Sequence, residues 1–252
     1  MPVQFGPLNA ALALCLLALP LGAAQAKPVN PAAAAVADPA RSDKHRALDE
    51  GRKPAEIVAF TAVKPGETVV DYISGSGYYA ELFAHAVGRK GTVYAINPSS
   101  FHDPKDFEAM LAKRSNIRLL VAPVAALQLP PRSTDTLFTH LNYHDIYWES
   151  EKFKFPRLDV PAIVAGWFQA VRPGGQVVIV DHVGPAGDPR VTADKLHRID
   201  PERVKADMAA AGFVFEAESA VLRRSEDDHT KGVFDPSLRG KTDRFVFKFR
   251  RP

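Results

Sequence analysis

Apolar residues in this chain occur in two patterns: short β-branched runs, and longer segments where they recur every three or four positions. The first pattern is typical of buried strands and the second of helices that bury one face. The predicted strands are residues 67–71, 92–96, 117–121, 134–141, 176–181, 213–219 and 243–249. The predicted helices are residues 43–52, 54–63, 78–87, 104–113, 160–171 and 201–212. This alternation indicates an α/β protein.

The last two predicted strands, 213–219 and 243–249, have no predicted helix between them. A parallel pair needs a long crossover connection, usually a helix, whereas an antiparallel pair does not. We therefore expect a doubly wound, mostly parallel, seven-stranded Rossmann-like sheet that ends in a C-terminal antiparallel strand pair.

The most informative segment is residues 67–80, ETVVDYISGSGYYA. A strand ends at Asp71, a loop contains Gly75 and Gly77, and a helix begins at Tyr78. A helix N-terminus offers unpaired N–H groups to an anion, and glycine allows close approach of the backbone. The segment predicts a nucleotide-type ligand site, although a capped helix after a tight turn would have the same pattern. The dinucleotide fingerprint does not fit, because it needs three glycines with the acid about twenty residues downstream.

An acid that precedes an x-G-x-G loop resembles motif I of class I S-adenosylmethionine-dependent methyltransferases. The turn at 172–175, RPGG, and the terminal strand pair are also similar to that family. The segments GSGYY, NYHDIYW, HRIDP and FDPSLRGKTDRFVFKF resemble a bacterial group of predicted methyltransferases with export signals. The resemblance covers roughly residues 54–250 and implies S-adenosyl-L-methionine as cofactor and methyl transfer as reaction.

In this family the carboxyl ends of the strands hold the methyl donor, as in other open α/β sheets. The resemblance implies that Asp71 accepts from the donor's ammonium group, and that Gly75 and Gly77 present N–H groups to its carboxylate. Asn97 stands where the family normally has an acid that binds the ribose, and Ile73 where it commonly has glycine. An amide lacks the strength of a carboxylate, and Asn97 equally suits a strand-ending turn. The expected cofactor-binding residues are Asp71, Gly75, Ser76, Gly77, Tyr78, Asn97 and Asn142.

Residues 140–148, HLNYHDIYW, form a second concentration of polar and aromatic groups. Methyl transfer requires positioning of the acceptor, and a base when the acceptor must lose a proton. His144 is the first candidate for that base, with Asp145 as its alternative or orienting partner and Tyr143 as a further catalytic candidate. Aromatic rings attract a sulfonium cation. The rings expected at the donor site are those of Tyr78, Tyr79 and Tyr143.

Two other groups of residues have less specific interpretations. His140 and His144 share the spacing of a metal-binding helix, but this segment leaves a strand, so we expect no metal. His197 and Arg198 precede the last predicted helix and are candidates for substrate contact, whereas Asp200 suits the N-cap of that helix.

Composition limits the classes of function. The chain has 252 residues, 46% of them hydrophobic, and a net charge of +3 from scattered residues. One domain is the natural number, and a strongly electrostatic nucleic-acid binder is disfavoured. We expect a small-molecule acceptor and no nucleic-acid partner. The alternative is a non-catalytic binding protein that retains the methyltransferase fold; a nicotinamide-dependent oxidoreductase lacks its glycine pattern.

The N-terminus predicts export. Residues 1–26 contain an apolar segment followed by Ala24-Gln25-Ala26, a pattern that signal peptidase accepts. Cleavage after Ala26 would leave a periplasmic or secreted protein without cysteine and without a membrane segment. We expect residues 27–41 to be an Ala/Pro-rich, poorly ordered tether and residues 42–252 to be a single methyltransferase-like domain.

Overall fold

The computed structural model describes residues 1–2 and 31–252. The helices of the described residues are α1 (Pro31–Ala37), α2 (Asp43–Arg46), α3 (Asp49–Arg52), α4 (Pro54–Thr61), α5 (Tyr78–Val87), α6 (Pro104–Lys113), α7 (Val160–Ala170), α8 (Pro189–Leu196) and α9 (Pro201–Ala210), with short 3₁₀ turns η1 (Val124–Ala126) and η2 (His144–Tyr147). The strands are β1 (Thr68–Tyr72), β2 (Thr92–Pro98), β3 (Ile117–Ala122), β4 (Thr134–His140), β5 (Val171–His182), β6 (Val214–Ser219) and β7 (Arg244–Arg250).

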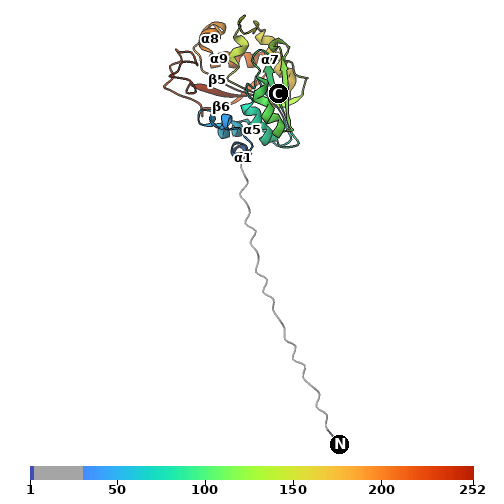
Figure 1. The fold of residues 1–252 in the computed structure, drawn as a ribbon. Helices are drawn as coiled ribbons and strands as arrows, with labels where there is room; N and C mark the ends of the chain where they lie inside the picture. Colours follow the sequence, from blue (N-terminus) through green and yellow to red (C-terminus); the bar gives the residue numbers. More distant parts are fainter. Residues whose placement is uncertain (3–30) are drawn as a thin grey trace.

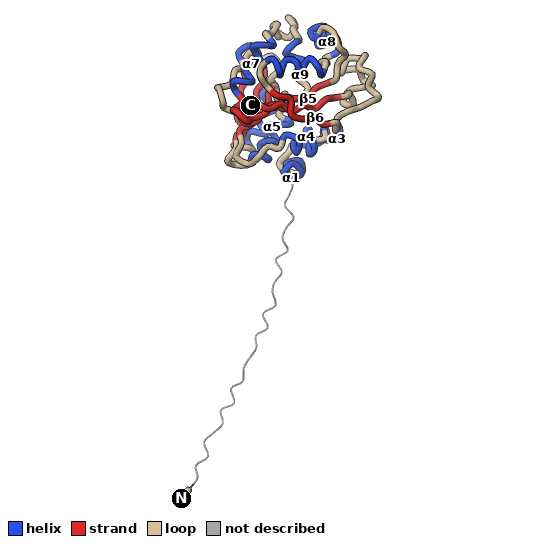
Figure 2. The backbone as a smooth tube through the Cα atoms, turned by 180° about the vertical axis from the view of Figure 1, so that it is seen from behind, coloured by secondary structure: helices blue, strands red, loops and turns tan. Residues whose placement is uncertain are grey.

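The seven strands form one sheet in the order β3-β2-β1-β4-β5-β7-β6. Strands β1 to β5 pair in parallel, whereas β7 runs antiparallel to both β5 and β6. Helices α7, α8 and α9 cover one face, and α1 and α5 lie on the other (Figure 1). Seen from behind, α3 and α4 lie on the same side as α1 and α5 (Figure 2). The predicted mostly parallel sheet with a terminal antiparallel pair is confirmed.

Side chains of β1 contribute to the core on both faces of the sheet, because successive residues of a strand point to opposite faces. Val70 and Tyr72 pack in the cluster that includes residues of α7 and α9. Val69 packs in the cluster that includes residues of α4, α5 and α6. Asp71, between Val70 and Tyr72, therefore shares the α5 side of the sheet, where the loop before α5 can reach it.

The prediction of a tether at 27–41 is wrong for its described part. Residues 31–37 form α1, which packs on α4 and α5 with Ala32 and Ala35 buried. Alanine has no long side chain to hold the backbones apart, so an alanine-rich helix can lie close against its neighbours. Residues 27–30 lie outside the described part of the chain.

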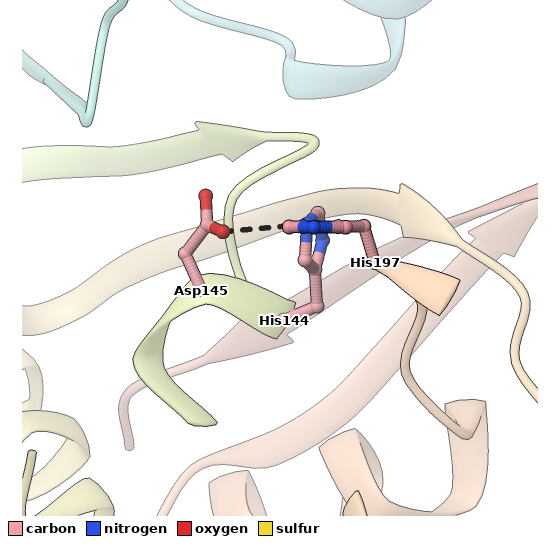
Figure 3. A group of neighbouring side chains, drawn as sticks. All are labelled: His144, Asp145 and His197. Atoms are coloured by element: carbon pink, nitrogen blue, oxygen red, sulfur yellow. Dashed lines mark ion pairs between the residues drawn. The ribbon is translucent and has the colours of Figure 1, made fainter. Parts of the chain in front are cut away.

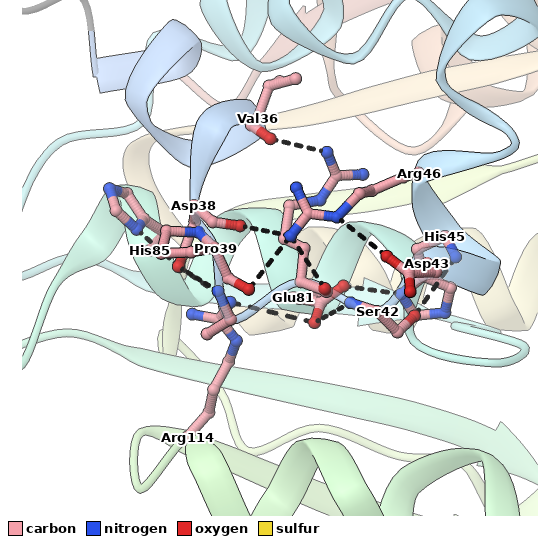
Figure 4. Close-up of polar contacts among 12 residues, drawn as sticks. Val36, Asp38, Pro39, Ser42, Asp43, His45, Arg46, Glu81, His85 and Arg114 are labelled. Atoms are coloured by element: carbon pink, nitrogen blue, oxygen red, sulfur yellow. Dashed lines mark hydrogen bonds and ion pairs between the residues drawn. The ribbon is translucent and has the colours of Figure 1, made fainter.

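Ionic contacts attach this N-terminal segment to α5 and to the residue after α6 (Figure 4). The Asp38 carboxylate lies 2.9 Å from both His85 Nδ1 and an Arg114 guanidinium nitrogen. The His45 ring nitrogen lies 2.7 Å from Glu81 Oε2. These contacts join positions far apart in the sequence, so local patterns did not reveal them.

The predicted helix over 43–52 is two short helices, α2 and α3. Ser42 caps α2 as expected, since its hydroxyl accepts from the His45 amide at 3.2 Å. Helix α8 was not predicted, although Asp188 and Pro189 are an N-cap and first-turn pair of the kind used to predict the last helix.

The predicted export signal, residues 1–26, lies outside the described residues except for the first two. Among the residues that are described, no helix is long and apolar enough to cross a membrane.

Candidate functional site

A cavity of about 190 Å³ lies at the carboxyl end of β1. Strand β1 pairs with β2 on one side and β4 on the other, so this is a point where the strand order reverses. Ligands of open α/β sheets bind at such switch points. The cavity is lined by Arg52, Asp71, Ile73, Ser74, Gly75, Ser76, Tyr78, Tyr79, His140, Leu141 and Asn142. The structure thus brings five of the predicted cofactor residues together here: Asp71, Gly75, Ser76, Tyr78 and Asn142.

Asp71 is the buried acid of this cavity, with 2% of its surface exposed. Burial raises the pKa of Asp71 to about 6, although the Ser74 hydroxyl, the Ala80 amide and the Arg52 charge act against that rise. The Ser74 hydroxyl donates to Asp71 Oδ2 at 2.6 Å. Asp71 can therefore accept a hydrogen bond from a cationic ligand at neutral pH.

The glycine loop uses its own amides internally. The Gly75 amide donates to Asn97 Oδ1 at 2.9 Å, and Asn97 Nδ2 donates back to the Gly75 carbonyl at 2.8 Å. The Gly77 amide donates to the Ser74 carbonyl at 3.0 Å. The expectation that these two glycine amides face a ligand carboxylate is therefore wrong in this conformation. The Ala80 amide, in the first turn of α5, lies instead against the Asp71 carboxylate.

Asn97 thus braces the loop instead of facing the cavity. It is 1% exposed, and both ends of its amide are engaged with the Gly75 peptide. Asn97, which was predicted to bind ribose, makes a structural contact instead. An amide suits this contact because it both donates and accepts hydrogen bonds. The same kind of role belongs to Asn142, whose Nδ2 donates to the carbonyls of Ile73 and His140 at 2.8 and 2.7 Å.

The two glycines of the loop should differ in their tolerance of alanine. Both have positive φ, +59° at Gly75 and +86° at Gly77. A Cβ at Gly75 meets open space, whereas at Gly77 it would lie 3.0 Å from the Phe107 ring and would also displace the flexible end of Met110, 2.3 Å away. We expect Gly75→Ala to lower the free energy of unfolding by about 1 kcal/mol and Gly77→Ala by about 2–3 kcal/mol. Urea unfolding measures both, and equal losses would contradict the packing argument.

Arg52, at the end of α3, is a cavity residue that the sequence analysis missed. Its guanidinium carbon lies 4.3 Å from the centre of the Tyr78 ring. The Tyr78 hydroxyl donates to Asp49 at 2.7 Å, and Asp49 in turn accepts from Arg41 through both carboxylate oxygens, at 2.7 and 2.8 Å. The N-terminal helices therefore place a cation at the cavity that holds Asp71.

His144 and Asp145 lie in η2, just beyond the last cavity residue, Asn142. Asp181, at the end of β5, accepts from the His144 amide at 2.8 Å and lies 2.9 Å from His144 Nδ1. Burial alone would lower the pKa of His144, but the Asp181 and Asp145 carboxylates outweigh it and raise the pKa to about 9. Burial raises the pKa of Asp145 to about 6, against the influence of His144. At neutral pH this pair holds a proton on His144 and a carboxylate on Asp145.

Tyr143 does not lie where it was predicted. It is fully buried, its hydroxyl donates to Asp207 Oδ2 at 2.9 Å, and its ring meets Trp167 edge-on at 5.9 Å. Its bulk belongs to the core between the sheet and helices α7 and α9, so it neither lines the Asp71 cavity nor faces a substrate there.

Arg198 also has a structural position instead of the predicted substrate contact. It is fully buried and pairs with Asp227 at 2.9 Å. Asp200, in contrast, caps α9 as expected, accepting from the Glu202 amide at 3.0 Å.

No protein-family model matches the chain. Similar solved structures include an S-adenosylmethionine-dependent methyltransferase from Aquifex aeolicus, at 20% identity and a TM-score of 0.54, covering 84% of this chain and 100% of that one. One from Mesorhizobium loti has 17% identity and a TM-score of 0.56, covering 81% and 100%. A TehB-like enzyme from Corynebacterium glutamicum has 13% identity and a TM-score of 0.51, covering 77% and 85%. This chain has the fold of the S-adenosylmethionine-dependent methyltransferases.

Proposed function

We propose that this protein transfers a methyl group from S-adenosyl-L-methionine to a small-molecule acceptor. The observation that carries the proposal is a cavity at the switch point of a methyltransferase fold that presents a buried carboxylate, Asp71, and a cation, Arg52. Opposite charges in one small cavity complement the zwitterionic amino-acid end of the donor.

Asp71 would accept from the donor's ammonium group, a charge-assisted hydrogen bond that is stronger than a neutral one. The donor's carboxylate would face Arg52 and the first amides of α5, where the helix dipole favours an anion. A cavity of about 190 Å³ suits the amino-acid portion of the donor, since complete ligand pockets are about 300–1,000 Å³. These contacts position the sulfonium for in-line displacement by the acceptor.

The His144–Asp145 pair, which follows the last cavity residue in the chain, would act on the methyl acceptor. An acceptor that must lose a proton needs a base within hydrogen-bond reach. Asp145, with its pKa near 6, is ionised at neutral pH and can take this proton, whereas the raised pKa of His144 keeps it protonated and argues against His144 as the base predicted from the sequence. A small acceptor is supported by the small net charge of +3, because nucleic-acid binding relies on concentrated positive charge. Export of the protein remains a prediction from residues 1–26.

Binding of S-adenosylhomocysteine, the product form of the donor, tests the proposal directly. Titration calorimetry of the protein should show one saturable site, and Arg52→Gln should weaken it about tenfold through loss of a charge-assisted contact. Arg89→Gln is the matched control, because Arg89 is exposed and does not line the cavity. Absence of saturable binding at millimolar ligand would overturn the proposal.

A further inference from the structure

Three potential metal ligands converge outside the Asp71 cavity (Figure 3). They are His144 and Asp145 on η2, and His197 immediately after α8. One ligand atom from each lies within 4.8 Å of the other two. Figure 3 shows the His197 side chain pointing toward the His144 ring from a different part of the chain. His140, which shares the spacing of a metal-binding helix with His144, does not join this cluster, and its ring packs against Tyr79 at 4.7 Å between centres.

The orientation of His144 is that of a metal ligand. Asp181 lies 2.9 Å from Nδ1 and also accepts from the His144 amide, so this side of the ring is held in place. The other nitrogen, Nε2, lies 3.4 Å from Asp145 Oδ1 and is directed into the cluster. Metal-binding histidines characteristically bind through one nitrogen while a carboxylate or carbonyl accepts from the other.

The surroundings favour a cation in this position. Asp145 and Asp181 bring two carboxylates to His144, and the neighbouring cation, Arg198, is already paired with Asp227 at 2.9 Å. The His197 ring packs against Trp148 at 5.7 Å and Phe234 at 4.9 Å between centres. Trp148 is buried, whereas Phe234 is exposed and His197 is only partly buried, which leaves a route for an ion to enter.

We propose that His144, Asp145 and His197 form a binding site for a divalent transition-metal ion, with Zn²⁺ as the best match. Two imidazoles and one carboxylate suit Zn²⁺ and its neighbours, whereas Mg²⁺ and Ca²⁺ prefer oxygen ligands alone. Bonds of about 2.0–2.2 Å place ligand atoms of one ion roughly 3.5 Å apart. The present separations of up to 4.8 Å thus require only a small inward movement. His182, whose ring centre lies 5.9 Å from that of His144, does not belong to the group of converging ligand atoms.

Three protein ligands leave a coordination position open, as in catalytic zinc sites. An ion there would displace the proton from His144 Nε2 and engage Asp145 as a ligand. It would then take over the role of Asp145, because it would bind a hydroxyl or thiol of the acceptor and lower its pKa, which promotes loss of the proton before methyl transfer. This consequence rests on the proposed function. Metal binding itself does not, and it can be measured without the methyl donor.

Metal titration of the full chain, first treated with chelator, tests the site. We expect calorimetry to show one Zn²⁺ ion bound per chain with micromolar or tighter affinity. Bound Co²⁺ should show the visible absorption bands of a low-symmetry site. His197→Ala and Asp145→Asn should each weaken binding at least tenfold. These are better tests than His144→Ala, which strips a buried carboxylate of its partner and endangers folding.

His85→Ala is the matched control, because His85 lies on α5, outside the cluster, and pairs with Asp38. It should bind Zn²⁺ as the wild type does. No stoichiometric binding, or equal affinity in His197→Ala and wild type, would overturn the metal site. A parallel titration with S-adenosylhomocysteine separates the two proposals: donor binding without metal binding refutes only this one, and metal binding without donor binding refutes only the proposed function.

Discussion

Asp71→Asn is expected to weaken S-adenosylhomocysteine binding by about 10- to 100-fold, the loss of a hydrogen bond to a charged group in a buried cavity. It should do so without destabilising the fold. The asparagine keeps an oxygen that can accept from Ser74, but it removes a buried negative charge. Calorimetry measures the affinity, and urea unfolding measures the stability of the same sample.

The sign of the stability effect follows from the raised pKa of Asp71, about 6 against an ordinary value of 3.8. An acid whose pKa is raised by folding lowers the free energy of unfolding. For Asp71 this penalty is complete above pH 6 and absent below pH 3.8. Asp71→Asn should therefore leave the free energy of unfolding at pH 7 unchanged or raise it by up to about 3 kcal/mol. The same titration predicts that ligand affinity of the wild type falls as pH drops below 6.

A matched control for Asp71 is Asp228→Asn, since the Asp228 carboxyl is fully exposed. It should change neither affinity nor stability. Unchanged ligand binding in Asp71→Asn would show that this carboxylate does not contact the donor, and a large loss of stability would show that it serves the fold instead.

Arg198→Met is expected to destabilise the protein by about 3–5 kcal/mol, because it leaves a buried carboxylate without its partner. Arg198 is fully buried and donates to the carbonyls of Val183 and Lys231, each at 2.9 Å, besides pairing with Asp227. The double variant Arg198→Met/Asp227→Asn should lose less than the sum of the single losses.

The contrast for Arg198 is Arg157→Met, which breaks an exposed pair with Glu149 and should cost no more than about 1 kcal/mol. Chemical unfolding of the wild type, Arg198→Met, Asp227→Asn, the double variant and Arg157→Met gives the comparison. If Arg198→Met lowers the free energy of unfolding by less than about 1 kcal/mol, the structural role is wrong and the predicted substrate contact of this side chain is favoured.

Most of the sheet could be predicted because its strands carry their own local pattern. Helices α5 and α6 have the predicted bounds, and the antiparallel end of the sheet follows from a missing helix between β6 and β7. The acid before the glycine loop was predicted for a similar reason. A strand, a turn and a helix start are consecutive in the chain, so Asp71 and the loop must meet.

Residues that depend on distant contacts were predicted less well. Arg52 reaches the cavity only because α1 to α3 pack against α5, and an alanine-rich segment gives no amphipathic signal for that packing. The sequence placed Tyr143 near the end of a strand but not on a particular face of the sheet. In the structure its ring packs in the core and its hydroxyl donates to Asp207.

By itself, the sequence determined the succession of most strands and helices along the chain, the antiparallel pair at its end and the acid before the glycine loop, since all of these follow from neighbours along the chain. Only the tertiary structure decided that Arg52 faces the same cavity as Asp71, that Asn97 braces the loop, and that His197 joins His144 and Asp145. The physical reason is that such pairings arise from packing between segments far apart in the chain, where burial and charge select the partners.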